Sequence, residues 1–313
     1  MRPIVIFFQS SSPESYPFTV ERYRSSYFLL AQLAQFKDVD LRFVFGLQNY
    51  SGNMIFRKYW KIIDNNFMVK ERSFRARLIY NKSSHLFRNG ERVMHPPFLE
   101  ELCRNKLVTH HYFHQLMKPC YPLHESNQAL LAEMLQTKLV VLKPVSGASG
   151  EGIRFVNREE LASFNVSQLS EPYLVQEFID SSNGIQGLTD GAHDLRLFVF
   201  NGTVKLSYIR KPKQGSYLAN IAQGGSVEVV PVEKLPLATK RIVRSIDASF
   251  KHIRPRLYTI DIMFENGTTP YVVELNSQPG LPAIELGDFT FKYMSHLLRL
   301  FSRKRRIFYH LVA

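Results

Sequence analysis

A β-hairpin is predicted by residues 258–281, which read YTIDIMFENGTTPYVVELNSQPGL. Two runs rich in β-branched and aromatic residues, Tyr258–Phe264 and Tyr271–Leu275, flank a turn that contains Asn-Gly. Asn-Gly between such runs is the strongest short-range signal for a hairpin. We therefore expect the two runs to pair as antiparallel strands.

Two carboxylates meet across this predicted hairpin. A turn centred between Gly267 and Thr268 pairs Asp261 with Glu274, with their Cβ atoms about 5 Å apart. Asn276 lies two residues beyond Glu274 and is therefore expected on the same face. The apolar neighbours are expected on the opposite face, and they are Ile260, Ile262, Val273 and Leu275.

A metal site is the functional interpretation of this carboxylate face. Two carboxylates and an amide, with no lysine nearby on that face, are costly to bring together unless a cation lies between them. Oxygen ligands of this kind suit Mg²⁺, which usually keeps waters and shares substrate phosphates. The alternative is an exposed sheet face that carries acids. The turn of sequence NSQPGL that follows immediately favours the metal site.

A glycine-rich loop lies at residues 140–153, which read VVLKPVSGASGEGI. Its glycines let backbone N–H groups approach phosphates closely, because no Cβ intervenes. The loop lacks the Gly-Lys-Ser/Thr of a P-loop, and it joins two predicted strands, Leu139–Leu142 and Ile153–Val156, where a dinucleotide fold needs a helix. We expect a strand–loop–strand lid over a triphosphate, with Lys143 as its cation, although an ordinary hairpin turn is the simpler alternative.

A second hairpin is predicted by Asp194–Phe200 and Thr203–Ile209, which Asn-Gly joins. With a two-residue turn and regular pairing, Arg210 faces away from Arg196. With a bulged three-residue turn, Arg210 opposes Asp194 and both arginines converge. We predict the bulge, because an active site would need both cations on one face.

The remaining pattern predicts a mixed α and β chain. Ile4–Phe8, a helix over about Val20–Phe36 and Leu41–Phe45 form a βαβ unit, which predicts a small parallel sheet. Two helical patterns between Asn105 and Gln136 are separated by Lys118-Pro-Cys-Tyr-Pro122, and Leu237–Phe250 is a further helix candidate. Residues 51–100 are basic, aromatic and irregular, and we assign them to the first domain.

Composition excludes several classes of protein. The 313 residues are 45% hydrophobic, which excludes a disordered chain, and two cysteines without a CxxC motif exclude a disulfide scaffold. A reducing, cytoplasmic location is therefore expected. No apolar run approaches the about 18 residues of a membrane span.

The net charge of +13 lies at the two ends of the chain. Residues 1–105 carry 16 basic and 9 acidic residues, residues 106–182 carry 6 and 8, and residues 183–313 carry 18 and 10. A nucleic-acid binder often has a continuous basic stripe with interleaved aromatics, and this pattern is missing here. Nucleic acid is therefore a disfavoured partner, and the charge favours an anionic partner without identifying it.

Several separated motifs follow one another between about Asn105 and Glu285, which is more than half of the chain. They are Asn105-Lys106, Leu142-Lys143-Pro144 with its glycine loop, Val175–Ile179, His193–Arg196, Arg210–Asn220 followed by Gly224-Gly225, Asp261, and Glu274–Leu281. Together they resemble the ATP-grasp superfamily, and within it the RimK-type glutamate ligases and related amino-acid and peptide ligases.

This resemblance implies an ATP-grasp fold of mixed α/β and α+β class. It divides the chain into a pre-ATP-grasp α/β domain (residues 1–105), a central lid subdomain with the glycine loop (106–182) and a C-terminal subdomain with the metal and arginine site (183–313). ATP would lie between the sheets of the two α+β subdomains.

The resemblance also assigns roles to individual residues. The expected ATP-binding residues are Lys106, Lys143, Gly147, Ser149, Gly150, Gly152, Gln176, Glu177, Phe178, Ile179, Asp180 and Lys213. The backbone of Glu177 and Ile179 would hold the adenine. The expected catalytic residues are Arg196, Arg210 and Asn220, and the expected ligands of two Mg²⁺ ions, which Mn²⁺ could replace, are Asp261, Glu274 and Asn276.

The reaction implied is phosphorylation of a carboxylate by ATP, followed by attack of an amine on the acyl phosphate. Leu218 stands where RimK-type ligases carry arginine, and Gln223 where a basic residue is common, so a glutamate substrate does not follow. A phosphotransferase acting on a hydroxyl, a nucleotide-binding module without catalysis, and a nucleic-acid binder stay as alternatives. A homo-oligomer is compatible with the sequence.

Overall fold

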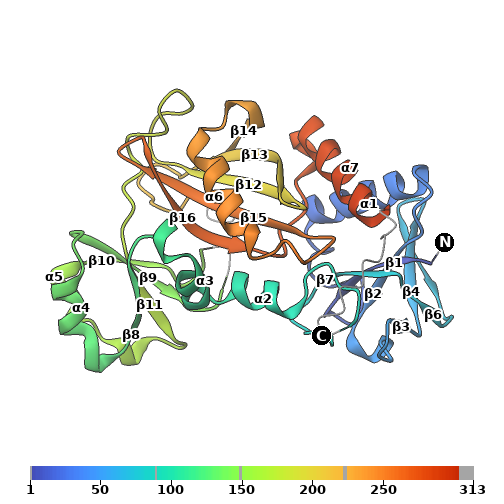
Figure 1. Ribbon diagram of the computed structural model, residues 1–313. Coiled ribbons are helices and arrows are strands. Elements are labelled where there is room, and N and C mark those ends of the chain that lie inside the picture. Colours follow the sequence, from blue (N-terminus) through green and yellow to red (C-terminus); the bar gives the residue numbers. More distant parts are fainter. Residues whose placement is uncertain (1, 89, 148–149, 221–223, 303–313) are drawn as a thin grey trace, which may run out of the picture. The chain divides into compact units, whose positions relative to one another are not determined.

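The computed structural model describes residues 2–88, 90–147, 150–220 and 224–302. They fall into two compact units (Figure 1). The first comprises Met1–Pro96, Ile253–Arg256 and Gly280–Ala313, and the second comprises Pro97–His252 and Leu257–Pro279. No helix among the described residues combines the length and the apolar character that a bilayer crossing requires.

The first unit is built on a five-stranded sheet of order β5-β4-β2-β1-β7. β1 (Ile4–Phe8) is buried at every residue and pairs in parallel with β2 (Leu41–Phe45) and β7 (Leu78–Lys82), as a continuous apolar run predicts. The predicted βαβ unit is confirmed, and α1 (Glu21–Phe36) is its helix. The other elements are η1 (Leu47–Asn49), β3 (Ile55–Phe56), β4 (Tyr59–Ile63), β5 (Asn66–Lys70), β6 (Phe74–Arg75), η7 (Ile284–Leu286) and α7 (Asp288–Ser302).

A four-stranded antiparallel sheet of order β10-β9-β11-β8 forms one part of the second unit. β9 (Leu139–Pro144) and β10 (Arg154–Asn157) flank the glycine-rich loop, as predicted. β8 (Cys120–Leu123) was expected to be only a break between helices, but it pairs with β11 (Tyr173–Glu177) at the sheet edge, where proline is tolerated. The helices are α2 (Pro97–Arg104), α3 (Lys106–Phe113), η2 (His114–Leu116), η3 (Glu125–Asn127), α4 (Gln128–Met134), α5 (Arg158–Leu161) and η4 (Val166–Gln168).

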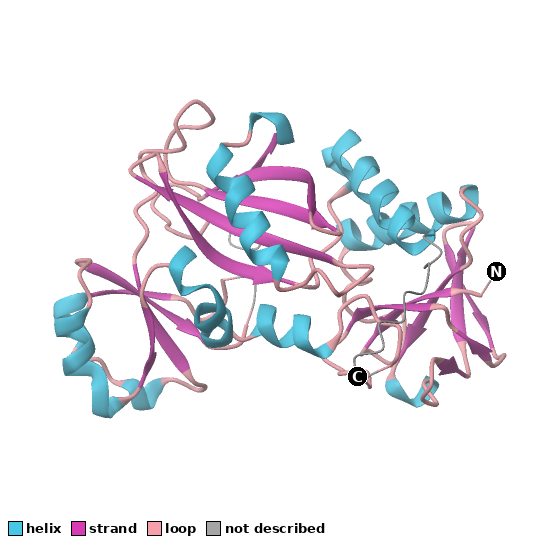
Figure 2. Cartoon of the chain, viewed as in Figure 1, coloured by secondary structure: helices cyan, strands magenta, loops and turns pink. Residues whose placement is uncertain are grey.

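A five-stranded antiparallel sheet of order β14-β13-β12-β15-β16 forms the other part of this unit. Its members are β12 (Asp194–Phe200), β13 (Thr203–Lys211), β14 (Ser226–Val230), β15 (Leu257–Glu265) and β16 (Thr269–Asn276), with η6 (Val232–Lys234) after β14. α6 (Leu237–Ala248) crosses one face of this sheet (Figure 2). We call this sheet with α6 the C-terminal sheet.

Both hairpins of the C-terminal sheet contain an extra residue. Asp194 pairs with Arg210, as predicted, but the turn itself has two residues and the shift lies between the strands, at Phe198/Val199. Asp261 pairs with Glu274, as predicted, with a shift between Asp261 and Ile262. The pairing of β15 with β16 is therefore not uniform.

The expectation that Val273 faces away from the carboxylates is wrong. Ile262 pairs with Val272, so Val273 is the residue without a partner in the ladder. A bulge breaks the alternation of side chains between the two faces. Val273 therefore lines the same pocket as Glu274.

The loop over residues 181–191 contains two glycines that have similar φ angles but different surroundings. Gly184 has φ +72°, and a Cβ there would lie 2.1 Å from the carbonyl oxygen of Thr189. Gly187 has φ +74° with nothing within 4 Å of its Cβ position. Gly187→Ala should cost about 1 kcal/mol of unfolding free energy because of φ alone. Gly184→Ala should cost clearly more, because backbone has to move.

The urea midpoint of each variant measures this difference. Equal midpoints for the two variants would contradict the close approach of Gly184 to Thr189.

Candidate active site

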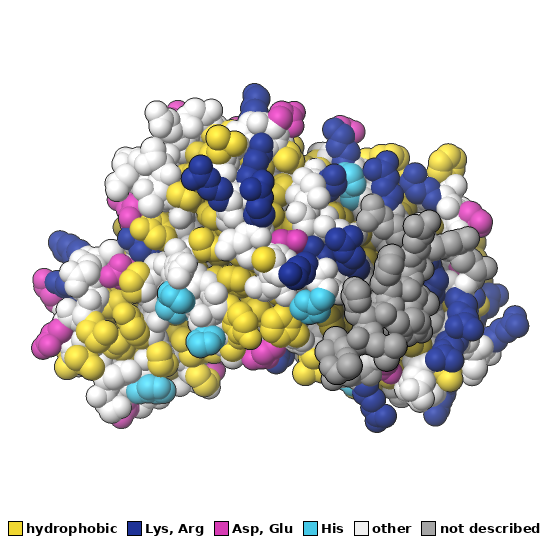
Figure 3. All heavy atoms as spheres, in the orientation of Figure 1, with side chains coloured by type: hydrophobic (Ala, Val, Ile, Leu, Met, Phe, Trp, Pro, Cys, Tyr) yellow, Lys and Arg dark blue, Asp and Glu magenta, His cyan; other side chains and the backbone are white. Residues whose placement is uncertain are grey.

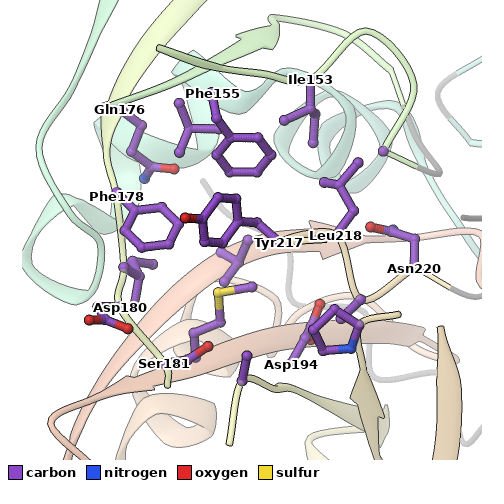
Figure 4. Close-up of a pocket in the computed structure, with 18 of the residues that line it drawn as sticks. Ile153, Phe155, Gln176, Phe178, Asp180, Ser181, Asp194, Tyr217, Leu218 and Asn220 are labelled. Carbon is purple, nitrogen blue, oxygen red and sulfur yellow. The ribbon is translucent and has the colours of Figure 1, made fainter. Parts of the chain in front are cut away.

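A pocket in the second unit lies between the four-stranded sheet and the C-terminal sheet (Figure 4). Strands from both sheets supply its walls, and the loop after β13 closes one side. Of the residues predicted to form a site, the following line it: Lys106, Lys143, Gly150, Gln176, Glu177, Phe178, Ile179, Asp180, Asn220 and Glu274.

Two lysines bring positive charge into this pocket. Lys143, on β9, is 7% exposed, and its Nζ donates to Oε1 of Gln176 at 2.6 Å. Burial lowers the pKa of Lys143 to about 8. Lys106 begins α3, and its Nζ donates to the carbonyl oxygens of Pro144 and Gly147, each at 3.1 Å. Burial also lowers the pKa of Lys106. The acceptors in these three hydrogen bonds are uncharged carbonyl and amide oxygens. The positive charges are therefore available to an anionic ligand.

The glycine-rich loop is shaped by its own packing. At Gly152, where φ is +71°, a Cβ would lie 2.7 Å from Oη of Tyr173 and 2.9 Å from Cγ of Pro144. The carbonyl oxygen of Gly152 accepts a hydrogen bond from Tyr173 at 2.9 Å. Gly150 lines the pocket, whereas Gly147 and Gly152 do not. Ser149 lies outside the described residues.

An aromatic group forms one end of the pocket. The ring of Tyr217 lies 5.0 Å from that of Phe155 and 5.1 Å from that of Phe178, measured between centroids (Figure 4). Ile153 and Met263 add apolar surface. An apolar slot lined with aromatic rings suits a flat heterocyclic base.

Polar groups flank this aromatic end. The N–H of Glu177 donates to the carbonyl oxygen of Pro119 at 3.1 Å, and its side chain accepts from the N–H of Gln136 at 2.7 Å. At Glu177 a base could therefore use the carbonyl oxygen but not the N–H. Oδ1 of Asp180 accepts from the N–H of Ser182 at 3.0 Å, which fixes Asp180 at the rim.

A buried charge cluster lies next to the pocket on one face of the C-terminal sheet. Arg196 donates to Asp261 through Nε at 2.7 Å and Nη2 at 2.5 Å. Nη2 of Arg210 donates to Oδ2 of Asp261 at 2.6 Å and also binds Asp194. The prediction that both arginines share one face is confirmed. Nη2 of Arg196 lies 3.5 Å from Oε1 of Glu274.

The carboxylates of this cluster differ in the direction in which their pKa values are shifted. Burial opposes the charged form of Asp261, but Arg196 and Arg210 overcome this and hold its pKa well below the ordinary value. Burial raises the pKa of Asp194 to about 7, although Arg210 opposes the shift. Burial and the charge of Asp261 raise the pKa of Glu274. Glu274 has the longest ion-pair distance of the three carboxylates, 3.5 Å to Arg196.

The carboxylate face was interpreted as a metal site because no lysine was expected nearby, but arginines supply positive charge there. Arg196 from the neighbouring strand β12 and Arg210 from β13, the strand beyond it, occupy both oxygens of Asp261. β12 lies beside β15 and places Arg196 opposite Asp261. Oδ1 of Asn276 accepts from the N–H of Gln278 at 2.8 Å. Over the described ranges, no group of three or more His, Cys, Asp or Glu is arranged to hold a metal ion.

The donor chemistry nevertheless fits a hard cation. The Glu274 side chain is 24% exposed, faces the pocket and carries a raised pKa, so a nearby cation would relieve its charge. Asp261 could contribute only by exchanging an arginine contact.

Sequence reasoning missed part of the pocket wall. Predicted site residues that do not line it are Gly147, Gly152, Lys213, Arg196, Arg210, Asp261 and Asn276. The missed lining residues include Phe155, Tyr217, His193, Asp194, Met263 and Val273. The predicted strand over Ile153–Val156 contained the signal for Phe155, because it follows the glycine-rich loop directly.

Comparisons with known proteins agree with this geometry. A model of the RimK-like ATP-grasp domain matches residues 118–289. A probable alpha-L-glutamate ligase of Thioalkalivibrio sulfidiphilus is 32% identical over 159 residues, which are 50% of this chain and 48% of that protein. The chain therefore spans about half the length of the curated relatives it matches.

Solved structures show the same fold. D-alanyl-alanine synthetase A from Vibrio cholerae has a TM-score of 0.60 at 14% identity, over 96% of this chain and 99% of that one. The ATP-grasp ligase PsnB, complexed with minimal precursor, Mg and ADP, has a TM-score of 0.60 at 13% identity, over 95% and 97%. At these identities the likeness concerns the fold alone.

The buried ammonium of Lys143 should make stability depend on pH. Its folded pKa of about 8 lies below the ordinary 10.5, so between these values the unfolded chain holds a proton that the folded chain has released. Raising the pH through this window therefore favours the folded state. Lys143→Met should be more stable than the wild type at pH 7, by on the order of 3 kcal/mol at most, and this difference should shrink towards pH 10.

Urea unfolding of both proteins at pH 7 and pH 10 measures the change. The exposed Lys138 supplies the control, since Lys138→Met should show no such pH-dependent difference. A constant gap for the Lys143 variant would refute the lowered pKa.

Proposed function

Because the chain belongs to the RimK-like ATP-grasp family, we propose that it is an ATP- and Mg²⁺-dependent ligase that joins a carboxylate to an amine through an acyl phosphate. The observation that carries this proposal is one continuous arrangement in the second unit. An aromatic slot, two lysines that form no ion pair with a described carboxylate, and a cluster of arginines and carboxylates follow one another along a single pocket and its wall.

We assign the base of ATP to the aromatic end of the pocket. Phe155, Phe178 and Tyr217 would pack against it, and Asp180 at the rim is placed to accept from a ribose hydroxyl. The phosphates would then meet Lys106 and Lys143. Phosphate oxygens beside them would favour the charged form of both lysines, which burial disfavours.

The chemistry proceeds in two transfers. A carboxylate oxygen of the substrate attacks the γ-phosphorus, the bond to the β–γ bridging oxygen breaks, and ADP leaves. The amine nitrogen then attacks the acyl carbon, the bond between that carbon and the phosphate oxygen breaks, and phosphate leaves. The amine proton passes to solvent or phosphate. Carboxylate activation is needed because a carboxylate has no good leaving group of its own.

Arg196 and Arg210 would offset the negative charge that gathers when phosphate meets the substrate carboxylate. Their side chains are already held by Asp261 and Asp194, so little reorganisation is needed at the moment of reaction. Glu274 and Asn276, with Asp261, are the residues that would hold Mg²⁺. When bound, this ion would supply further charge neutralisation at the phosphates.

The acid substrate is proposed to be an acidic small molecule or peptide. Relatives named alpha-L-glutamate ligases and a structural neighbour solved with a minimal precursor support this class. The net charge of +13 favours an anionic partner. Leu218 on the pocket wall makes glutamate itself a weaker candidate, because it supplies no cation for a second carboxylate.

A mass-spectrometric screen of acid and amine pairs with ATP and Mg²⁺ tests the reaction. The expected product has the summed mass of acid and amine less one water, and it forms with equal amounts of ADP and phosphate. ADP with a stable phosphorylated product and no free phosphate would identify a phosphotransferase instead. ATP binding without any turnover across the panel would contradict the ligase proposal.

Glu274→Gln should abolish turnover of the pair found in that screen and leave the urea midpoint nearly unchanged. The variant removes a charge that faces the pocket, and its amide keeps the size and polar character with which Glu274 meets Arg196 and Asp261. Loss of one such electrostatic contribution commonly costs on the order of 10²–10³ in rate. Titration calorimetry of ATP with and without Mg²⁺ tests whether the loss of turnover comes from loss of the metal. The increase in ATP affinity caused by Mg²⁺ should disappear in the variant. A preserved Mg²⁺ effect would remove Glu274 from the metal site.

A further inference from the structure

A second hollow lies on the opposite face of the C-terminal sheet from the candidate active site. Arg196 and Asp261 are directly paired and face the active-site side. Tyr258, an odd number of residues from Asp261 along β15, faces the other way and meets α6 and the turn after it. Its Oη donates to Oδ1 of Asp247 at 3.0 Å, and its ring lies 5.1 Å from that of Phe250. A ligand in the hollow therefore cannot touch the reacting groups.

The hollow is a groove of about 390 Å³ between α6, η6 and the β12–β13 turn, and we call it the α6 groove. Its floor is apolar. Leu235 and Val243 are buried beneath it, and Val204 and Val232 form half-buried walls. This volume falls in the range of natural ligand pockets and would accept large apolar side chains.

Positive charge surrounds this apolar floor. Lys240, Arg244 and Lys251 all line the groove, and their spacing of four and seven residues places them along one side of the helix and the turn after it. All three are exposed, and no ion pair joins any of them to another described residue. Asp247, the acid among them, is already bonded to Tyr258. Figure 3 shows Lys and Arg side chains gathered over α6.

The spacing of these cations favours a chain over a small anion. α6 rises by about 12 Å from Lys240 to its end at Ala248, and Lys251 lies beyond that end. A single phosphate or carboxylate cannot contact cations at both ends of such a distance. An extended peptide spans the same length in about four residues, since each adds about 3.3 Å.

We propose that the α6 groove binds a segment of a partner protein in which large apolar side chains stand beside several Asp or Glu residues. The apolar side chains enter the groove and the carboxylates meet Lys240, Arg244 and Lys251. Charge complementarity selects this partner: residues 232–252 hold five Lys or Arg against two acids, a net charge of +3. This inference does not depend on the ligase proposal, because the groove lies on the other face of the sheet.

Fluorescence anisotropy with labelled hexapeptides tests the proposal on the full-length chain. The peptide ELEEFE carries both required features, KLKKFK reverses its charge, and ESEESE lacks its apolar side chains. ELEEFE should bind at least about tenfold more tightly than either control, and its affinity should fall as salt increases. If ELEEFE does not bind, or if ESEESE binds equally well, the proposal is wrong.

Charge reversal locates the binding site. The double variant Lys240→Glu with Arg244→Glu should weaken ELEEFE binding by about tenfold or more. Lys138→Glu, which changes an exposed lysine in the bend before β9, should alter binding less than about twofold. Urea midpoints confirm that both variants fold. ATP affinity should be the same in both, because none of these residues lines the active-site pocket.

Two outcomes would overturn the inference even if peptide binds. Equal loss in the Lys138 variant would show that binding depends on general charge and not on the groove. A labelled thymidine oligonucleotide that binds as tightly as ELEEFE, and loses affinity in the double variant, would show that the groove recognises nucleic acid. Ligase turnover is measured separately, so loss of either function leaves the other interpretable.

Discussion

The carboxylate of Asp261 is the anchor of the C-terminal sheet. It is 1% exposed, and both of its oxygens are held by Arg196 from β12 and Arg210 from β13. A buried carboxylate without such partners is strongly destabilising, and so is a buried arginine without its carboxylate. Three strands are therefore tied together by one charge, and the wall of the active site cannot shift without breaking these bonds.

Local patterns predict much of the fold but not the elements that depend on distant partners. The apolar run Ile4–Phe8 and the hairpin strand Asp194–Phe200 match their strands to the residue, because burial and Asn-Gly turns are local signals. β8 was missed because Cys120–Leu123 contains a proline and is short. It is a strand only through its pairing with β11, about fifty residues later.

The candidate site shows the same division. Lys143 was expected from the glycine-rich loop, Glu274 from the predicted hairpin and Lys106 from the family resemblance. All three line one pocket. The arginine contacts of Asp261 were missed, because they require β12 to lie beside β15, and no local pattern reveals that order of strands. Tyr217 was not expected in the pocket for a similar reason, since its loop reaches the aromatic end only in the folded chain.

The two bulges determine which face of the sheet the charged side chains occupy, independently of the turn at the end of each hairpin. In each hairpin the extra residue lies between the turn and the working side chains. Without it, Asp261 would pair with Val273, and Arg210 would point to the α6 face. The turn of each hairpin can therefore adopt its preferred conformation. Beyond the bulge, the side chains of the charge cluster still point to the active-site face of the sheet. Changes of sequence at the tips can accumulate without disturbing the alignment of the arginines and carboxylates.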